Sequence, residues 1–219
     1  PALNCRFCTT GNNVGEQEVV DKAVADVVEV ARAARDESGV TFVHLNAGFQ
    51  GNRGVQFAEP YIAALKELGV LVGAQLAPEK DFSRYDRLLE LGVDHISFCL
   101  EFVDPAWFAK ICPGKERVLG QQVFFDSIAY CAKRMSRGSV SGEIIAGVEP
   151  LEQTLKGIDW IAAQGAFPTV CIFRPTVGSD MEDWPSPGYE EMRQVMANVY
   201  DACRRNWIPD GAAPNRPAM

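Results

Sequence analysis

Residues 89–105 read LELGVDHISFCLEFVDP and contain a pattern that recurs along the chain. A helix is expected to end at Gly92, the apolar run VDHISFCL (93–100) is predicted as a buried strand, and the acidic segment EFVDP follows it. The junction LELGV (89–93) nearly copies KELGV (66–70), which precedes another strand-like run. Repetition of helix, glycine and apolar strand predicts stacked strand–helix units.

The same order extends through the sequence. Predicted strands cover 40–46, 70–76, 93–100, 142–147 and 168–173. Helices are expected near 57–68, 82–91, 151–164 and 188–206, with a longer helical stretch at 104–137. An earlier helix is predicted from apolar residues spaced between Val19 and Ala31; Asn13 and Glu16 resemble a capping box for its start, and Gly39 ends it.

Strands that alternate with helices predict a parallel sheet with right-handed crossovers. An open doubly wound sheet and a barrel both fit this alternation. The barrel is favoured because no dinucleotide-binding fingerprint follows the early strands. The fold class is therefore predicted as α/β, a partial parallel barrel.

The composition restricts the class of protein. With 219 residues and 47% hydrophobic content, we expect a single domain over residues 1–219. The net charge of −8 and the absence of a Lys/Arg run argue against a nucleic-acid partner, and no apolar run suits a bilayer span. Seven cysteines without a regular framework argue against a disulfide scaffold, so we expect a reducing, cytoplasmic compartment.

Polar and glycine-rich segments follow each predicted strand: NAGFQGNRG, APEKD, EFVDP, VEP and RPTVGSD. The carboxyl ends of parallel strands are where such folds place ligands and chemistry. This locates a site without identifying its reaction.

The thiol pair CRFC (5–8) precedes the first helix. A redox dithiol should open its helix directly, and a zinc site needs two further ligands that the sequence does not pair with it. An iron–sulfur cluster suits thiolates, and an iron without a protein ligand leaves a coordination position for substrate or cofactor.

CRFC, with Phe7 before the last cysteine, resembles the closing part of the radical S-adenosylmethionine (radical SAM) motif C-x3-C-x-aromatic-C. The first cysteine of that motif would fall at Pro1, so we expect the first cluster cysteine and the first strand upstream. The resemblance continues in SFCLEFVDPAWFAKICPGK (97–115), which is similar to the biotin synthase and hydrogenase-maturase branch. GEIIAGVEP (142–150) is similar to the strand G-x-I-x-G-x-x-E, FRPTVGSD (173–180) to the adenine-binding segment, and LNAGFQG (45–51) stands in place of a Gly-Gly-Glu element.

This resemblance implies a partial (β/α)6 barrel with strands two to six present, and a [4Fe–4S] cluster bound by Cys5 and Cys8. It also implies an S-adenosylmethionine site. The residues assigned to that site are Asn46, Ala47, Gly48, Glu101, Arg117, Gly147, Arg174 and Thr176. Of these, Glu101 has an alternative structural interpretation, in which it pairs with a nearby lysine or arginine.

The implied reaction is reductive cleavage of S-adenosylmethionine to a 5′-deoxyadenosyl radical, which removes hydrogen from a small-molecule substrate. Ferredoxin or flavodoxin would supply the electron. A role in cofactor biosynthesis is expected, with the iron hydrogenase cofactor maturase as the nearest model. The segment EDWPSP (182–187) is expected to be a covering loop, with Trp184 flanking substrate or plugging the barrel.

Two other functions remain open from the residues alone. One is a cluster-free parallel-barrel lyase or aldolase, for which Lys80 at a strand end is a candidate. The other is a binding module in which Cys5 and Cys8 form half of a zinc site.

Overall fold

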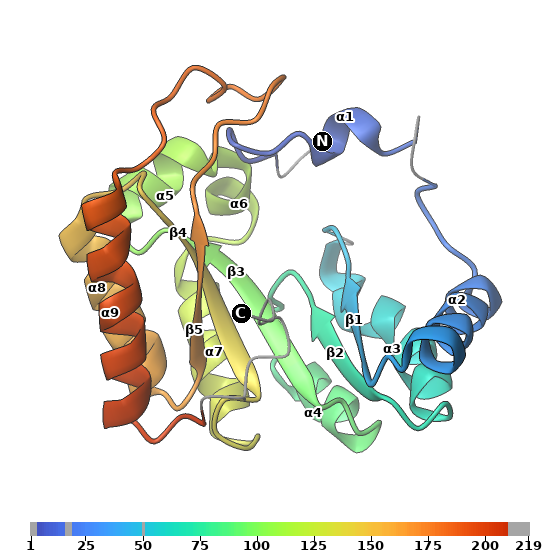
Figure 1. Cartoon of the computed structure of the whole chain (residues 1–219). Coiled ribbons are helices and arrows are strands. Elements are labelled where there is room, and N and C mark those ends of the chain that lie inside the picture. The colour runs from blue at the N-terminus through green and yellow to red at the C-terminus, as the bar shows by residue number, and fades with distance from the viewer. Residues whose placement is uncertain (1–3, 16–18, 50, 210–219) are drawn as a thin grey trace.

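Five parallel strands form one sheet in the order β1-β2-β3-β4-β5 (Figure 1). The structure, a computed structural model, describes residues 4–15, 19–49 and 51–209. The strands are β1 (Phe42–Asn46), β2 (Leu71–Gln75), β3 (His95–Glu101), β4 (Val140–Ala146) and β5 (Phe167–Ile172). All four pairings are parallel, as predicted, and β1 and β5 are the two edges of the described sheet.

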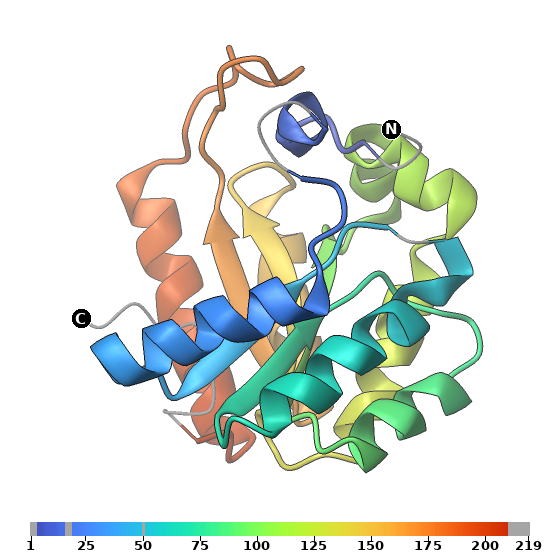
Figure 2. The same cartoon turned by 90° about the vertical axis from the view of Figure 1, so that its right-hand side faces the viewer.

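Helices cover the outer face of this sheet (Figures 1 and 2). The longer ones are α2 (Val24–Ser38), α3 (Gly54–Lys66), α4 (Ser83–Glu90), α7 (Gln122–Ala132), α8 (Leu151–Ala163) and α9 (Tyr189–Arg205). The short elements are α1 (Thr10–Asn13), the 3₁₀ turn η1 (Gly51–Arg53), α5 (Pro105–Ile111) and α6 (Pro113–Val118). Within the described ranges, none of these helices has the length and apolar character needed to span a membrane.

The helical stretch expected at 104–137 divides into three helices, with one break at Pro113 and a second at Gly120, whose φ is +78°. The Asp104 side chain accepts hydrogen bonds from the backbone N–H groups of Ala106 and Trp107 and so caps α5, which has Pro105 in its first turn. Pro113 then occupies the first turn of α6. These two short helices carry the chain across the carboxyl end of β3 before α7 returns along the sheet.

The predicted start of the first long helix is wrong. The capping residue of α2 is Ala23, with no side-chain cap, while Asn13 lies in α1 and Glu16 falls outside the described residues. Val19 and Val20 precede α2 and are 69% and 63% exposed. Their spacing matches the helical period of the apolar residues in α2, although neither valine belongs to that helix. The predicted end is confirmed, because Gly39 closes α2 in the left-handed conformation.

The two faces of the sheet differ in chemistry. Outward side chains on the central strands, such as Val72, Ile96, Phe98 and Ile144, are completely buried against the helices. Each side chain of this size contributes roughly 1.5–3 kcal/mol of burial free energy. The inward side chains of β3 are instead polar. We call the space in front of the inward face the lumen.

The lumen has an aromatic floor at the amino ends of the strands. The His44 ring lies 5.7 Å from Phe42 and 5.5 Å from His95, measured between centroids. Gly73 is required between them, since a Cβ atom there would lie 2.6 Å from Phe42 Cζ and 2.8 Å from His44 Cδ2. Aromatic rings therefore pack closely together at this end of the lumen.

Candidate functional site at the carboxyl ends of the strands

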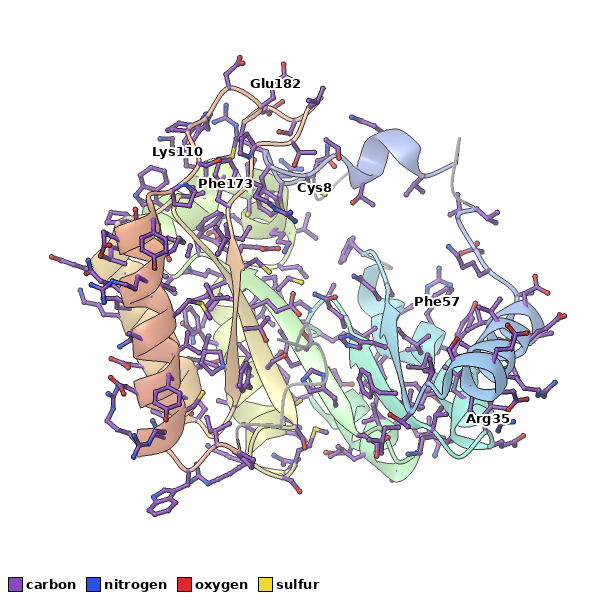
Figure 3. All side chains as sticks on the ribbon, in the orientation of Figure 1. Cys8, Arg35, Phe57, Lys110, Phe173 and Glu182 are labelled. Atoms are coloured by element: carbon purple, nitrogen blue, oxygen red, sulfur yellow. The ribbon has the colours of Figure 1, made fainter. Side chains whose placement is uncertain are left out.

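The loop that contains Cys5 and Cys8 lies over the carboxyl ends of the strands. Its backbone is joined to the end of α5, where Arg6 N–H donates to the Ile111 carbonyl at 2.9 Å. Arg6 forms an ion pair with Asp180 at 3.6 Å, and Asn12 Nδ2 donates to Gly178 O at 3.5 Å. In Figure 3, Cys8, Lys110, Phe173 and Glu182 all lie at this end of the molecule. The thiol pair and the segment after β5 therefore share one rim, as predicted.

Cys5 packs against a third thiol, Cys112, at the junction of α5 and α6. Cys5 is 7% exposed and Cys112 is fully buried. A hydrogen bond from the Cys112 thiol lowers the pKa of Cys5 despite burial, and the charge of Lys115 acts in the same direction. The same bond raises the pKa of Cys112. Cys5 thus has the stronger thiolate character, which metal ligation requires.

Cys8 is half-buried and faces the start of α1. Its Sγ lies 3.2 Å from Thr10 Oγ1 and 3.5 Å from the Thr10 backbone nitrogen. Phe7, between the two cysteines, packs edge-on against Phe102 with ring centroids 6.3 Å apart. That contact fixes the loop over the end of β3.

Glu101 and Lys115 form an ion pair directly beneath this loop. Their side chains are only 12% and 15% exposed, and Lys115 Nζ lies 2.6 Å from Glu101 Oε1. Lys115 also donates to the Cys99 carbonyl at 3.0 Å. Burial raises the pKa of Glu101; burial alone would lower the pKa of Lys115, but the carboxylate of Glu101 raises it. The ammonium group therefore keeps its charge.

Glu101 has a backbone conformation that few side chains adopt. Its φ is +68°, and the register between β3 and β4 shifts between Cys99 and Glu101. A non-glycine residue in this region costs about 1–3 kcal/mol, and such outliers cluster at functional sites. The predicted site role of Glu101 gains geometric support, although the structural pairing with a lysine is also present.

A second polar layer lies deeper in the lumen. Glu143 on β4 accepts hydrogen bonds from Gln75 Nε2 at 2.5 Å, Ser97 Oγ at 2.6 Å and Cys99 Sγ at 3.3 Å. Burial raises the pKa of Cys99 well above its ordinary value, and the charges of Glu101 and Glu143 add to this effect. Cys99 is therefore neutral, and its thiol contacts both Gln75 and Glu143.

The residues predicted after β1 lie on another part of the rim. Ala47 N–H donates to the Gln75 carbonyl at 3.1 Å, while Asn46 and Gly48 are exposed. All three line a hollow of about 140 Å³ between the end of β1, α3 and the segment before α2. A larger hollow of about 650 Å³ near Trp207 lies at the C-terminal end of α9, at the opposite end of the molecule (Figure 1).

Three predicted cofactor residues have exposed side chains. Arg117 follows Lys115 by two positions on α6, and residues two apart do not share a helix face. Lys115, not Arg117, is the cation that meets Glu101. Arg174 and Thr176 are exposed after β5, where Thr176 Oγ1 lies 3.4 Å from the Arg174 carbonyl.

The segment 182–187 packs on the rim as a covering loop, but Trp184 does not plug the barrel. Its ring meets Trp107 of α5 edge-on at 6.5 Å, with Lys110 Nζ 5.7 Å above it. Gly147 has a φ of +91°, and a Cβ atom there would lie 2.5 Å from Pro187 Cβ. Only glycine, which lacks a Cβ atom and tolerates a positive φ, allows Pro187 to pack this close to the backbone at position 147.

Glu149 has a structural role. It is buried and accepts hydrogen bonds from the backbone N–H groups of Val103 and Asp104 at 3.0 and 2.8 Å. Burial raises its pKa. Its carboxylate holds the turn between β3 and α5.

Several residues of the site were not identified from the sequence. Cys112 looked like a buried apolar residue of a helix, and its contact with Cys5 joins segments far apart in the chain. Gln75, Ser97 and Glu143 carry a usable signal, since each is a polar residue that alternates with buried apolar residues of the outward face.

Solved structures with this arrangement are known. HydG from Carboxydothermus hydrogenoformans, an FeFe-hydrogenase maturase, matches with a TM-score of 0.73 at 14% identity, over 93% of this chain and 49% of that one. SuiB from Streptococcus suis, bound to S-adenosylmethionine, matches with a TM-score of 0.68 at 15% identity, over 93% and 45%. HemN from Escherichia coli, a coproporphyrinogen III oxidase and radical SAM enzyme, matches with a TM-score of 0.58 at 12% identity, over 92% and 50%.

The chain therefore has the partial parallel barrel fold of radical SAM enzymes, and the fold predicted from the sequence is confirmed. The sequence is also similar to a curated protein: bacteriochlorophyllide c C-7(1)-hydroxylase from Chlorobaculum limnaeum is 24% identical over 90% of this chain and 55% of that protein. No family model matches the sequence. The chain spans about half the length of these four proteins.

Proposed function

We propose that this protein is a radical SAM enzyme in which residues 1–219 form one catalytic domain. Cys5 and Cys8 would be ligands of a [4Fe–4S] cluster, and S-adenosylmethionine would bind beside it at the carboxyl ends of the strands. The observation that carries this proposal is the position of Cys5, which lies close enough to Glu101 and Lys115 for their charges to act on its thiol.

The donor set present fits part of such a cluster. Cys5 and Cys8 are soft sulfur ligands three positions apart, and the environment of Cys5 favours its thiolate. Across the described ranges, no group of three His, Cys, Asp or Glu side chains is arranged to hold a metal ion. The two thiolates therefore fit as part of the ligand set, and the resemblance implies a third cysteine ligand.

When bound, the cluster and S-adenosylmethionine would supply a 5′-deoxyadenosyl radical able to remove a hydrogen atom from a substrate. This chain's own residues would position the reactants and exclude water. Glu101, held by Lys115, presents a fixed carboxylate beneath the thiol loop. The contact between Phe7 and the buried Phe102 would hold that loop in place, and the segment after β5 would flank it through the Arg6–Asp180 ion pair.

We further propose that a small-molecule substrate binds in the lumen and that a ferredoxin or flavodoxin supplies one electron. The proposed cofactor contacts are those predicted from the sequence, at Asn46, Ala47, Gly48, Gly147, Arg174 and Thr176. A maturase role in cofactor biosynthesis is the finer proposal. It is supported by the likeness to HydG, whose identity to this chain is 14%.

The test uses the full-length protein, reconstituted anaerobically with iron and sulfide. With dithionite and S-adenosylmethionine, we expect 5′-deoxyadenosine by liquid chromatography. Cys5→Ala and Cys8→Ala should each lose most bound iron and all product, while Cys131→Ala, which changes a buried thiol on α7, should retain both. A protein that holds iron and sulfide but forms no 5′-deoxyadenosine would refute the mechanism.

A further inference from the structure

Glu143 is the feature of the lumen that the proposed function leaves without a role. It lies on β4, half-buried, one layer below the Glu101–Lys115 pair. The two layers are connected through Cys99, whose carbonyl accepts from Lys115 while its thiol donates to Glu143. Glu143 is therefore the carboxylate that lies next below the Glu101–Lys115 pair.

All three hydrogen-bond donors to Glu143 are neutral. They are the amide of Gln75, the hydroxyl of Ser97 and the thiol of Cys99. In the part of the chain that the structure describes, no ion pair includes Glu143. Neutral donors orient and solvate a carboxylate, but they do not cancel its charge.

The charged groups nearby do not supply the missing cation. Lys115 is engaged by Glu101 at 2.6 Å. Arg174 is exposed at the end of β5. His95 lies below Ser97 on the same face of β3, and burial, with a contribution from His44, lowers its pKa to about 4, so it is neutral near pH 7.

The carboxylate also has room for one more donor. A carboxylate offers about four lone-pair positions. Ser97 uses one on Oε1, whereas Gln75 and Cys99 use two on Oε2. One position on Oε1 is left, and it belongs to the oxygen with the fewest partners.

We propose that Glu143 binds an ammonium group of the substrate, so that the substrate class is amine-bearing small molecules. This inference rests on the proposed function, because only a reaction makes the bound amine a substrate. The amine-binding site itself does not depend on that reaction. A charge-assisted hydrogen bond from the ammonium group to Oε1 would orient the molecule with its remainder toward Cys5. An anionic substrate group would be repelled from this layer.

The test compares three probes of matched size by ligand-observed NMR titration at low salt: butylammonium, butan-1-ol and butyrate. The sample is the full-length, cluster-loaded protein with S-adenosylmethionine. We expect butylammonium to bind at least about tenfold more tightly than either other probe, as a charge-assisted hydrogen bond would provide. Glu143→Gln should remove this preference and leave butan-1-ol unchanged, while Glu37→Gln, which removes an exposed carboxylate on α2, should change nothing.

Equal binding of butylammonium and butan-1-ol to the wild-type protein would overturn the proposal whether or not the variant folds. Butylammonium selectivity that survives in a folded Glu143→Gln variant would overturn it as well. The 5′-deoxyadenosine assay on the same samples separates the two proposals. Product without amine selectivity removes only the amine site, and amine selectivity without product removes only the radical mechanism.

Discussion

The lumen contains two carboxylates that the fold treats differently. Glu101 has a lysine partner, with Lys115 Nζ at 2.6 Å, and both side chains are nearly buried. Glu143 is surrounded by an amide, a hydroxyl and a thiol. The charge of Glu101 is compensated by a lysine of the same chain, whereas the charge of Glu143 is only solvated by neutral groups. We infer that the first is part of the permanent architecture and that the second awaits a ligand.

The contrast has an energetic consequence. Removal of one partner of a buried ion pair leaves a charge without compensation, which is strongly destabilising. Removal of a carboxylate that neutral groups solvate deletes an uncompensated charge together with its desolvation penalty. Substitutions at the two positions should therefore have very different effects on stability.

The largest effect is expected for Lys115→Met. The buried Glu101 carboxylate would lose its cation and the Cys99 carbonyl would lose a donor, so the free energy of unfolding should fall by about 3–5 kcal/mol. Urea unfolding of the cluster-free protein measures this loss. The double variant Lys115→Met, Glu101→Gln should recover a large part of it. Equal stability of the single and double variants would show that the pair is not coupled.

The next effect is a loss of stability in acid that depends on His95. Its pKa is about 4 in the folded chain against 6.5 ordinarily, so the unfolded chain binds more protons between these values. Stability conferred by the neutral ring is present above pH 6.5 and is lost as the pH falls toward 4, by roughly 3 kcal/mol at about 1.4 kcal/mol per pKa unit. Urea unfolding at a series of pH values should show this slope, and His95→Gln should flatten it.

This pH series also tests the comparison between the carboxylates. A His95 that titrated near pH 6.5 or above would carry charge close to neutrality and would be a cation one layer below Glu143. An unchanged slope in His95→Gln would mean that the ring is not the group responsible. In either case, the description of Glu143 as a carboxylate without a cationic neighbour would need revision.

The smallest effect is expected for Glu143→Gln. It keeps the shape of the side chain, loses the charge, and should change the free energy of unfolding by less than about 1 kcal/mol. The same urea experiment measures it beside Lys115→Met. A loss as large as that of Lys115→Met would mean that Glu143 is needed by the fold itself, and the distinction between the two layers would disappear.

The strands and most helices could be predicted from the sequence because their signals are local. The run VDHISFCL gives a buried strand, and the glycine before it ends a helix, whatever the rest of the chain does. The error at α2 has the opposite cause. Val19 and Val20 continue a helical period, but no cap fixes the helix start there, and both side chains are exposed. Periodicity alone does not define where a helix begins.

The site could be predicted only where a residue follows its strand directly. Glu101 and Gly147 lie at the ends of predicted strands, and their assignment to the cofactor site, like that of the thiol pair, came from the resemblance and stays a prediction. Arg117 was assigned from the sequence, whereas the structure brings Lys115, two positions earlier on α6, to Glu101. The contact of Cys112 with Cys5 and the donors to Glu143 join residues distant in sequence, and no local pattern encodes such pairs.

Pro187 packs directly on Gly147. The position of segment 182–187 above the strand ends therefore depends on the absence of a Cβ atom at residue 147. With only a hydrogen atom at that position, the proline ring rests against the turn that follows β4. In a relative with alanine at this position, the segment would have to move away from the turn after β4. The opening at the carboxyl ends of the strands would then be wider and admit more water. The access of water to the lumen would thus depend on the smallest side chain in the protein.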